Sequence, residues 1–513
     1  MKSPALVSWY QRLPVTRKVV LAGIATALSF PPFPLGFLAW VGLVPLIDAW
    51  LKSPSPARSA YLGLLWSLGF LFTLLYFVAF NSGTVWWAAT ASMIALVLFL
   101  TLNYAFIGWW FGWLRLRWGP AAVWSLPLLW VTVEFIRTFG TMGFPWIALA
   151  NSQAGYLLPI QLAEYTGIYG LSFWVVLVNV LTRELWHNKN WAVGAPVLAA
   201  ALIVPWLSGW ALLPPAPVAT LRVGVVQPNT NALEKWNPAL QQRHFDQLNA
   251  LTREVARDHP QIVFWPEAAT PAYLRHGGRG YLREIQEELR ELQLTVITGM
   301  PEYERLPGGE VQYFNSAGLI DSNGIGDRYD KIHLVPFGEY IPFSDWFEVL
   351  KELNLGQANF KAGDSYTVFD VDGARFSVGI CYETTRPQLY RHFARAGADF
   401  LVGLVNDAWF GFTSEPYQHA AQFRYRAVEL RRPVVRAANT GISLVIDQTG
   451  RIIARLGLNR EGVFTADIAP SDKSTFYLRH GDFFAWLIAA LAVGLSIITL
   501  RMELQSRSRP DDS

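Results

Sequence analysis

The distribution of hydrophobic and polar positions divides the chain into two parts. Between residues 18 and 212, apolar residues dominate in successive runs of roughly the length that a helix needs to cross a bilayer, about 20 residues. Between residues 220 and 475, short apolar runs alternate with amphipathic segments, as in a soluble domain. We therefore expect a polytopic α-helical membrane domain joined to an α/β domain.

The apolar runs predict about eight transmembrane helices. Seven lie within residues 1–213, a proline-rich linker follows at 214–219, and the eighth lies at 483–501 before a polar tail at 502–513. The expected spans are 19–30, 35–51, 60–80, 86–113, 120–138, 167–186, 192–212 and 483–501.

The charges between these spans predict their orientation. Thirteen lysine and arginine residues fall on the side of the two chain ends, whereas Arg137 and Arg479 fall on the other side. Because short loops rich in positive charge stay in the cytoplasm, we expect both termini there. Residues 220–475 would then lie in the periplasm, and the membrane would be the inner membrane of a Gram-negative cell.

Residues 220–475 alternate between strand and helix patterns. Apolar strands are expected at 221–227, 261–267, 295–302, 314–320, 330–336, 367–371, 376–381, 399–406, 434–437, 443–447, 452–456 and 463–468. Helices are expected at 238–258, 279–292, 384–396 and 415–431. Strands that are apolar throughout are typical of sheets covered by helices, which predicts a layered α/β domain.

Composition then narrows the classes of function. Only 16% of the residues are charged, against about 25% in an average globular chain, and the net charge is +3. Without a dense run of Lys or Arg, nucleic acid is not an expected partner. One cysteine excludes an internal disulfide, and the eight histidines lack metal-binding spacings, so we expect no metal and no cofactor.

Three predicted strand ends carry reactive side chains. Glu267 follows an apolar strand, a setting that raises a carboxyl pKa, and Lys331 lies in an otherwise apolar stretch. Cys381 ends a strand before a predicted helix start, whose positive potential should lower the thiol pKa. Each residue alone is more often a buried thiol or part of a structural ion pair. Together, a base, an ammonium group and a thiol form a nucleophilic acyl-transfer site.

The segments around these residues resemble a known superfamily. Trp-Pro-Glu at 265–267, Lys-Ile-His-Leu-Val-Pro-Phe-Gly-Glu at 331–339 and Gly-Ile-Cys-Tyr-Glu at 379–383 are similar to the catalytic segments of the nitrilase, or carbon–nitrogen hydrolase, superfamily. The inserted domain and its spans resemble one membrane branch, the apolipoprotein N-acyltransferase family. So do Gly-Phe-Pro-Trp at 143–146 and Asn-Asp-Ala-Trp-Phe-Gly at 406–411. The resemblance implies an αββα sandwich with a Glu-Lys-Cys triad.

The resemblance also implies roles for single residues. It makes Glu267 the general base, Lys331 the oxyanion stabiliser and Cys381 the nucleophile. Glu339 would hold Lys331 or assist proton transfer, and the backbone N–H of Tyr382 would complete the oxyanion hole. The remaining residues implied are Glu383, which would orient the pocket, and the substrate-binding candidates Trp236, Phe144, Trp146, Asn406 and Trp409.

The reaction implied is a ping-pong acyl transfer. Cys381 would take an acyl chain from a phospholipid, with phosphatidylethanolamine as the expected donor, and form a thioester. The α-amine of the diacylglyceryl-cysteine of an apolipoprotein would then receive the chain. A membrane-tethered enzyme of this kind is expected to be a monomer.

Three alternatives use the same residues differently. A Cys–His site that pairs Cys381 with His333 or His419 leaves Glu267 and Lys331 unexplained. A membrane amidase or lipid hydrolase would pass the same thioester to water, although a hydrolase of soluble amides needs no membrane spans. A transporter or receptor with a degenerate binding domain would be expected to have lost one of the three polar residues, and none is lost.

Overall fold

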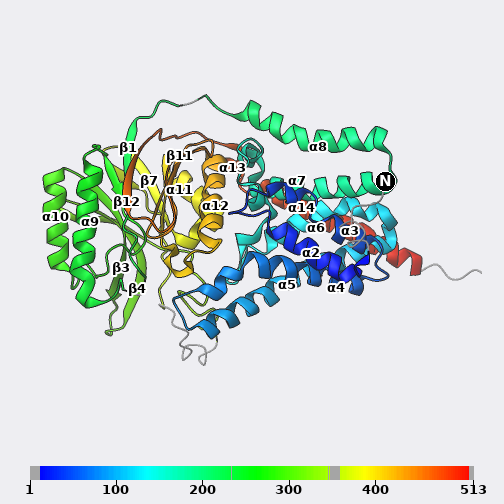
Figure 1. The fold of residues 1–513 in the computed structure, drawn as a ribbon, viewed down its shortest axis with the longest axis horizontal. Helices are drawn as coiled ribbons and strands as arrows, with labels where there is room; N and C mark the ends of the chain where they lie inside the picture. Colours follow the sequence, from blue (N-terminus) through cyan, green and yellow to red (C-terminus); the bar gives the residue numbers. More distant parts are fainter. Residues whose placement is uncertain (1–11, 216, 233, 345, 347–358, 508–513) are drawn as a thin grey trace, which may run out of the picture. The chain divides into compact units, whose positions relative to one another are not determined.

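The chain forms two compact units (Figure 1). The structure, a computed structural model, describes residues 12–215, 217–232, 234–344, 346 and 359–507. A helical unit comprises Met1–Ala79, Thr90–Leu212 and Asp482–Ser513, and an α/β unit comprises Phe80–Ala89 and Leu213–Gly481. The short segment Phe80–Ala89 joins the α/β unit because the Ser82 N–H donates to the carbonyl of Trp409 at 2.9 Å.

The helical unit contains a helix at each expected span. Its helices are α2 (Val15–Ala27), α3 (Val44–Leu51), α4 (Pro56–Leu74), α5 (Trp86–Trp118), α6 (Leu126–Ile136), α7 (Ala163–Asn188), α8 (Trp191–Leu212) and α14 (Phe483–Arg507). The predicted membrane domain is therefore confirmed as a set of long apolar helices. The polar tail expected at 502–513 lies partly outside the described residues, and α14 continues into its first part.

The lengths of these helices differ more than the sequence suggested. Within the described residues, five apolar segments are long enough to cross a membrane: Pro56–Leu74, Trp86–Ile136, Pro159–Asn188, Trp191–Leu212 and Phe483–Ser506. The second of them contains both α5 and α6. The span expected at 35–51 is divided into a 3₁₀ turn, Gly36–Trp40, and the eight-residue α3. The count of eight spans therefore stays a prediction.

The segment that contains Phe144 and Trp146 is fixed to the end of α6. Arg137 Nε donates to the carbonyl of Phe144 at 3.2 Å, and Glu134 Oε1 accepts the Leu149 N–H at 2.9 Å. Trp146 is buried and packs against Phe77, with 5.8 Å between the ring centroids. Glu134 in α6 and Arg137 directly after it therefore bind the backbone of the segment that follows the helix.

The α/β unit is built on two six-stranded sheets. The first has the order β12-β1-β2-β3-β4-β5 and the second the order β11-β10-β9-β8-β7-β6. The strands are β1 (Leu221–Gln227), β2 (Ile262–Phe264), β3 (Thr295–Arg305), β4 (Val311–Asp321), β5 (Gly324–Asp330), β6 (Phe369–Val371), β7 (Ala374–Ile380), β8 (Phe400–Val405), β9 (Val434–Ala438), β10 (Ser443–Ile446), β11 (Ile452–Leu456) and β12 (Gly462–Ile468). In each sheet three neighbouring strands are parallel, β1-β2-β3 and β7-β8-β9.

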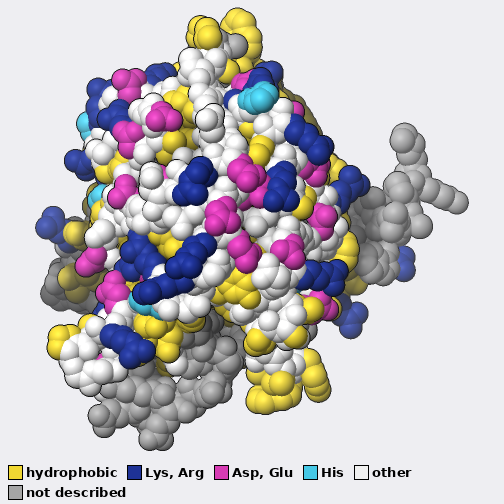
Figure 2. All heavy atoms as spheres, turned by 90° about the vertical axis from the view of Figure 1, so that its left-hand side faces the viewer, with side chains coloured by type: hydrophobic (Ala, Val, Ile, Leu, Met, Phe, Trp, Pro, Cys, Tyr) yellow, Lys and Arg dark blue, Asp and Glu magenta, His cyan; other side chains and the backbone are white. Residues whose placement is uncertain are grey.

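The two sheets lie between two pairs of helices (Figure 1). Apolar residues of the first sheet, including Val226 and Trp265, pack against α9 (Gln241–Ala256) and α10 (Arg279–Leu292). Alternate residues such as Val225 and Phe264 join a core with the second sheet, α11 (Pro387–Ala396) and α12 (Glu415–Leu430). This is the predicted αββα sandwich. The face of the molecule that carries α9 and α10 shows positive and negative side chains intermixed (Figure 2).

Two predicted elements around the reactive residues were wrong. The strand expected at 330–336 is absent, because β5 ends at Asp330 and the backbone N–H groups of Ile332 and His333 bind the Glu383 carboxylate instead of a neighbouring strand. The helix expected from 384 begins at Pro387, after a 3₁₀ turn at Cys381–Thr385. The residue before a proline disfavours helical geometry, and Arg386 is accordingly non-helical.

Candidate active site

The reactive residues follow the ends of three strands. Two of these strands, β2 and β5, belong to the first sheet, and β7 belongs to the second sheet. β2 is parallel to β3, and β5 has the same direction because it is antiparallel to β4, which is antiparallel to β3. Glu267 lies three residues beyond the end of β2, and Lys331 directly follows β5. Cys381 directly follows β7 in the other sheet. The carboxyl ends of these strands therefore bring together residues that are far apart in sequence.

Lys331 lies between two carboxylates. Its ammonium group donates to Glu339 Oε1 at 2.8 Å and lies 3.9 Å from Glu267 Oε1. The Asn315 amide on β4 donates to both carboxylates, at 2.8 Å to Glu267 and 3.0 Å to Glu339. Lys331 is 1% exposed and Glu267 7%, so these charges interact with little solvent screening. Glu339 therefore holds Lys331 as expected.

This environment sets the protonation of Glu267 and Lys331. Burial raises the pKa of Glu267, although Lys331 acts in the opposite direction. Burial opposes the charge of Lys331, but the Glu339 and Glu267 carboxylates outweigh that effect and raise its pKa. Lys331 is thus a permanent cation, and Glu267 is a stronger base than an exposed carboxylate. The expected rise in the Glu267 pKa is confirmed in direction.

The backbone at Cys381 turns sharply out of β7. Its φ of 51° lies in the left-handed region, which is unfavourable for a residue with a Cβ atom and is found at functional sites. The turn ends the strand and begins the 3₁₀ turn Cys381–Thr385. The half-buried Cys381 is the only cysteine in the chain.

The thiol does not have the lowered pKa expected from the sequence. Burial raises the pKa of Cys381 well above its usual value, Glu267 raises it further, and Lys331 lowers it only in part. The prediction assumed a helix beginning at 384, whereas α11 begins at Pro387. Burial and the Glu267 charge therefore favour the neutral form of the Cys381 thiol.

Glu383 links the segment of Lys331 to the strand of Cys381. Its Oε1 accepts hydrogen bonds from the Tyr329 hydroxyl and from the N–H groups of Ile332 and His333, at 2.8 to 2.9 Å. Its Oε2 accepts the Ile380 N–H at 2.7 Å. Burial raises its pKa to about 7, while Lys331 and the backbone donors act in the opposite direction. Glu383 thus fixes the segment that follows β5 to the end of β7.

We expect Glu383→Gln to weaken both stability and activity. The glutamine amide offers one acceptor oxygen, so its NH₂ group would face the Ile380 N–H and leave that buried donor unpaired, at a cost of about 1–3 kcal/mol. A displaced Lys331 or Cys381 should slow acyl transfer by about 10²-fold. Thermal unfolding in detergent and initial rates would measure the two effects. Glu288→Gln on α10, whose partner Arg253 is 61% exposed, is the matched control with a small expected effect.

Sequence reasoning missed two residues of the site. Asn315 lies within β4 and was not distinguished from other strand residues, since only the fold places its amide between Glu267 and Glu339. Lys235 is 2% exposed, and its ammonium donates to the backbone carbonyl of Glu267 at 3.3 Å. Burial lowers its pKa to about 8. The position of Lys235 next to the substrate-binding candidate Trp236 was the available signal.

The remaining substrate-binding candidates lie in different surroundings. Trp236 is 45% exposed, beside the buried Lys235. Asn406 is buried at the end of β8, where its Oδ1 accepts hydrogen bonds from the Asn439 amide and the Ala408 N–H. Trp409 follows it and is half-buried. Phe144 and Trp146 belong to the helical unit.

The Cys–His alternative is not supported by the position of His419. Its Nδ1 lies 3.0 Å from Asp407 Oδ1, and its Nε2 lies 3.0 Å from the backbone carbonyl oxygen of Cys381. Both ring nitrogens thus face oxygen atoms rather than the thiol. Burial lowers the pKa of His333 to about 4, which makes it a weak base.

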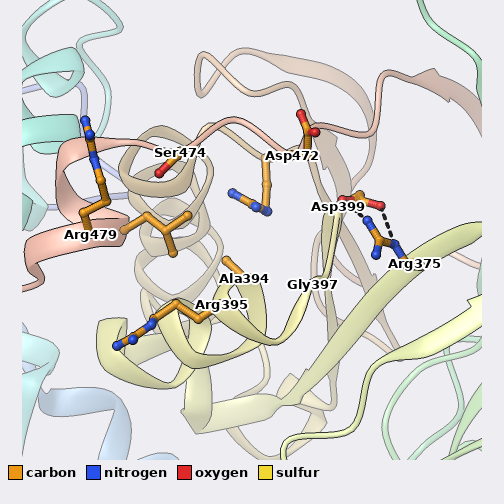
Figure 3. Close-up of a pocket in the computed structure, with 10 residues that line it drawn as sticks. Arg375, Ala394, Arg395, Gly397, Asp399, Asp472, Ser474 and Arg479 are labelled. Carbon is orange, nitrogen blue, oxygen red and sulfur yellow. Dashed lines mark hydrogen bonds and ion pairs between the residues drawn. The ribbon is translucent and has the colours of Figure 1, made fainter.

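A separate hollow of about 440 Å³ in the α/β unit shares no lining residue with this cluster (Figure 3). Arg375 at its edge pairs with Asp399, as the dashed lines in Figure 3 show. Arg432 donates to the carbonyls of Ala398, Leu430 and Lys473. Arg375 and Arg432 in this hollow therefore already have hydrogen-bond acceptors.

Two families match the chain. Residues 22–181 match the apolipoprotein N-acyltransferase N-terminal domain, and residues 222–475 match the carbon–nitrogen hydrolase family. The chain is 34% identical to the apolipoprotein N-acyltransferase of Geobacter metallireducens over 496 residues, 94% of each protein. The chain belongs to the apolipoprotein N-acyltransferase family.

A second relative agrees with this family. The apolipoprotein N-acyltransferase of Brucella melitensis is 33% identical over 517 residues, which cover 94% of this chain and 95% of that protein. Among solved structures, a mutant amidase of the nitrilase superfamily from Nesterenkonia is 18% identical, with a TM-score of 0.39. It covers 52% of this chain and 96% of its own. The matches to the Geobacter and Brucella proteins confirm the resemblance to the apolipoprotein N-acyltransferase family over nearly the whole chain.

Proposed function

We propose that this protein transfers a fatty acyl chain from a phospholipid to the N-terminal amine of the diacylglyceryl-cysteine of an apolipoprotein, through a thioester on Cys381. The observation that carries the proposal is the cluster at the ends of β2, β5 and β7, in which the buried Glu267 and Lys331 lie with the half-buried Cys381. Its occurrence in a member of the apolipoprotein N-acyltransferase family sets the substrate class.

The first half-reaction forms the thioester. Glu267 accepts the thiol proton as Cys381 Sγ attacks the ester carbonyl carbon of the phospholipid. The Lys331 ammonium and the Tyr382 N–H stabilise the oxyanion. As the ester C–O bond breaks, Glu267 returns the proton to the departing alkoxide, and the lysophospholipid leaves.

The neutral thiol requires attack and proton transfer to occur together. Reference pKa values of 8.5 for Cys and 4.3 for Glu differ by about 4 units, or about 6 kcal/mol. In this site burial raises both pKa values, so the proton acceptor is strengthened while the thiolate is not formed in advance. Lys331 then stabilises the negative charge that develops on the substrate oxygen in the transition state. This charge is absent from the ground state.

The second half-reaction discharges the thioester. The amine of the apolipoprotein attacks the thioester carbonyl carbon, and Glu267 accepts a proton from the nitrogen. The C–S bond breaks, the amide forms, and the Cys381 sulfur recovers its proton from Glu267. The products are the N-acylated lipoprotein and the free enzyme.

The membrane placement is part of the proposal. Residues 1–213 and 483–501 would span the inner membrane, with both termini and the tail 502–513 in the cytoplasm and the linker 214–219 leading to a periplasmic domain at 220–475. The asymmetry of Lys and Arg residues supports this orientation, and the unit boundaries at Leu212 and Asp482 support the division. The exposed Trp236 and the half-buried Trp409 are the proposed acyl-chain contacts, and a monomer is the proposed state.

A two-stage mass measurement tests this function. Detergent-solubilised protein incubated with phosphatidylethanolamine should gain the mass of one acyl chain in a hydroxylamine-labile bond. Addition of a diacylated lipopeptide with a free α-amine should discharge the chain and yield an acylated lipopeptide. The same lipopeptide with an acetylated amine is the matched control and should leave the thioester intact. Equal loss of the thioester in both arms would show transfer to water and favour a hydrolase.

A further inference from the structure

A buried charged network lies behind Cys381 and has no part in the reaction described above. His419 on α12 lies between Asp407, which follows β8, and the backbone of Cys381. Arg436 on β9 donates to Asp407 Oδ2 at 2.7 Å, and its Nη2 lies 3.3 Å from His419 Nδ1. His419 and Asp407 are each 1% exposed, and Arg436 is fully buried.

The hydrogen bond between His419 and Cys381 has a defined donor and acceptor. A carbonyl oxygen can only accept a hydrogen bond, so His419 Nε2 carries the proton and donates to the Cys381 carbonyl at 3.0 Å. With the proton on Nε2, Nδ1 is an acceptor, and Arg436 Nη2, which lies 3.3 Å from it, can donate to it as well as to Asp407 Oδ2. Although burial opposes its charge, Arg436 and His419 hold the pKa of Asp407 below its usual value, so the carboxylate remains ionised.

The carbonyl of Cys381 and the N–H of Tyr382 belong to one planar peptide group. The direction of the carbonyl therefore fixes the direction of the N–H, which points to the opposite side. A hydrogen bond to the carbonyl also polarises the amide and strengthens its N–H as a donor. The proposed function assigns that N–H to the oxyanion hole.

We propose that His419 is a positioning residue, which aligns and polarises the Cys381–Tyr382 peptide so that the Tyr382 N–H binds the oxyanion. The inference rests on the proposed function. The left-handed φ of 51° at Cys381 explains why such a contact is needed, because a residue with a Cβ atom relaxes out of this conformation unless its surroundings hold it. His419, backed by Asp407, supplies a hydrogen bond specific to this conformation.

The same network is poorly suited to a metal ion. Asp407, Glu415 and His419 have ligand atoms within 4.8 Å of one another. However, the Arg436 guanidinium contacts both Asp407 and His419, so a divalent cation there would meet a buried positive charge. Burial and the neighbouring Asp407 also raise the pKa of Glu415 well above its usual value, which favours a neutral carboxyl group over an ionised ligand.

The test compares two reactions of the same thiol. Acylation by phosphatidylethanolamine passes through an oxyanion, whereas alkylation by iodoacetamide is a direct displacement without one. In full-length protein in detergent, His419→Phe should slow acylation by about 10²-fold while alkylation stays near the wild-type rate. His419→Gln, which keeps an N–H donor, should recover part of the acylation rate. His276→Phe, at a histidine that binds Glu302 and stacks on Tyr303, is the matched control and should change neither rate.

The outcomes separate this inference from the function on which it rests. An equal loss of acylation and alkylation in His419→Phe, or no loss of acylation, would overturn the positioning role. If His419→Phe does not fold, Asp407→Asn replaces it, because this variant removes the charge behind His419 with little change in shape, and the same selective loss is expected. Wild-type protein that is alkylated but never acylated would overturn the proposed function itself.

Discussion

Replacing Cys381 with alanine should abolish the acyl-enzyme and reduce acyl transfer by about 10⁴-fold or more. No other cysteine exists in the chain, so no second thiol can carry the acyl group. Intact mass after incubation with phosphatidylethanolamine should show no gain, and transfer to a diacylated lipopeptide should fall to the uncatalysed background. The substitution removes one half-buried sulfur atom, so the fold should persist.

Cys381→Ser is the companion variant. It keeps a nucleophilic atom in nearly the same place, but an alkoxide is much harder to form than a thiolate. We expect the same thermal unfolding temperature as the wild type and nearly the same loss of activity as Cys381→Ala. A hydroxylamine-labile adduct that persists in Cys381→Ala would place the acyl group on another residue and refute the thioester mechanism.

Glu267→Gln should slow thioester formation by about 10²- to 10⁴-fold, the range expected for the loss of a general base. The glutamine carbonyl can still accept the hydrogen bond from Asn315, and Lys331 keeps Glu339 as its partner, so the fold should be retained. Single-turnover acylation followed by mass spectrometry measures the effect. Glu288→Gln on α10 provides the control for an equivalent change outside the site.

The pH dependence of the same reaction gives a second readout. Glu267 must be ionised to accept the thiol proton, so the rate should fall as the pH decreases through its pKa. This fall of the rate at acidic pH is the acid limb of the profile. Because burial raises the pKa of Glu267, the midpoint of the acid limb should lie above the ordinary glutamate pKa of about 4.3. The limb should disappear in Glu267→Gln. An unchanged acid limb in this variant would assign it to another group and exclude Glu267 as the base.

The sequence alone determined the architecture and the identities of the central residues. Apolar runs located the helices of the membrane part, since a helix must satisfy its own backbone in lipid and the required apolar length is readable in the chain. Alternating strands and helices predicted a layered α/β domain, and the resemblance to the nitrilase superfamily implied the αββα sandwich. Glu267, Lys331 and Cys381 were singled out as a set, since each alone is more often structural, and the resemblance of their segments to nitrilase segments implied their roles.

Only the tertiary structure decided how these residues are supported. Asn315 reaches Glu267 from 48 positions away, and His419 reaches the Cys381 carbonyl from 38 positions away. Such contacts depend on strand order and direction, which a local pattern does not contain. The thiol pKa is the clearest case: local sequence predicted a lowered value from a helix start, whereas burial by distant segments and the Glu267 charge raise it. The pKa of a side chain depends on how deeply it is buried and on the charges around it. Both are established by the tertiary fold.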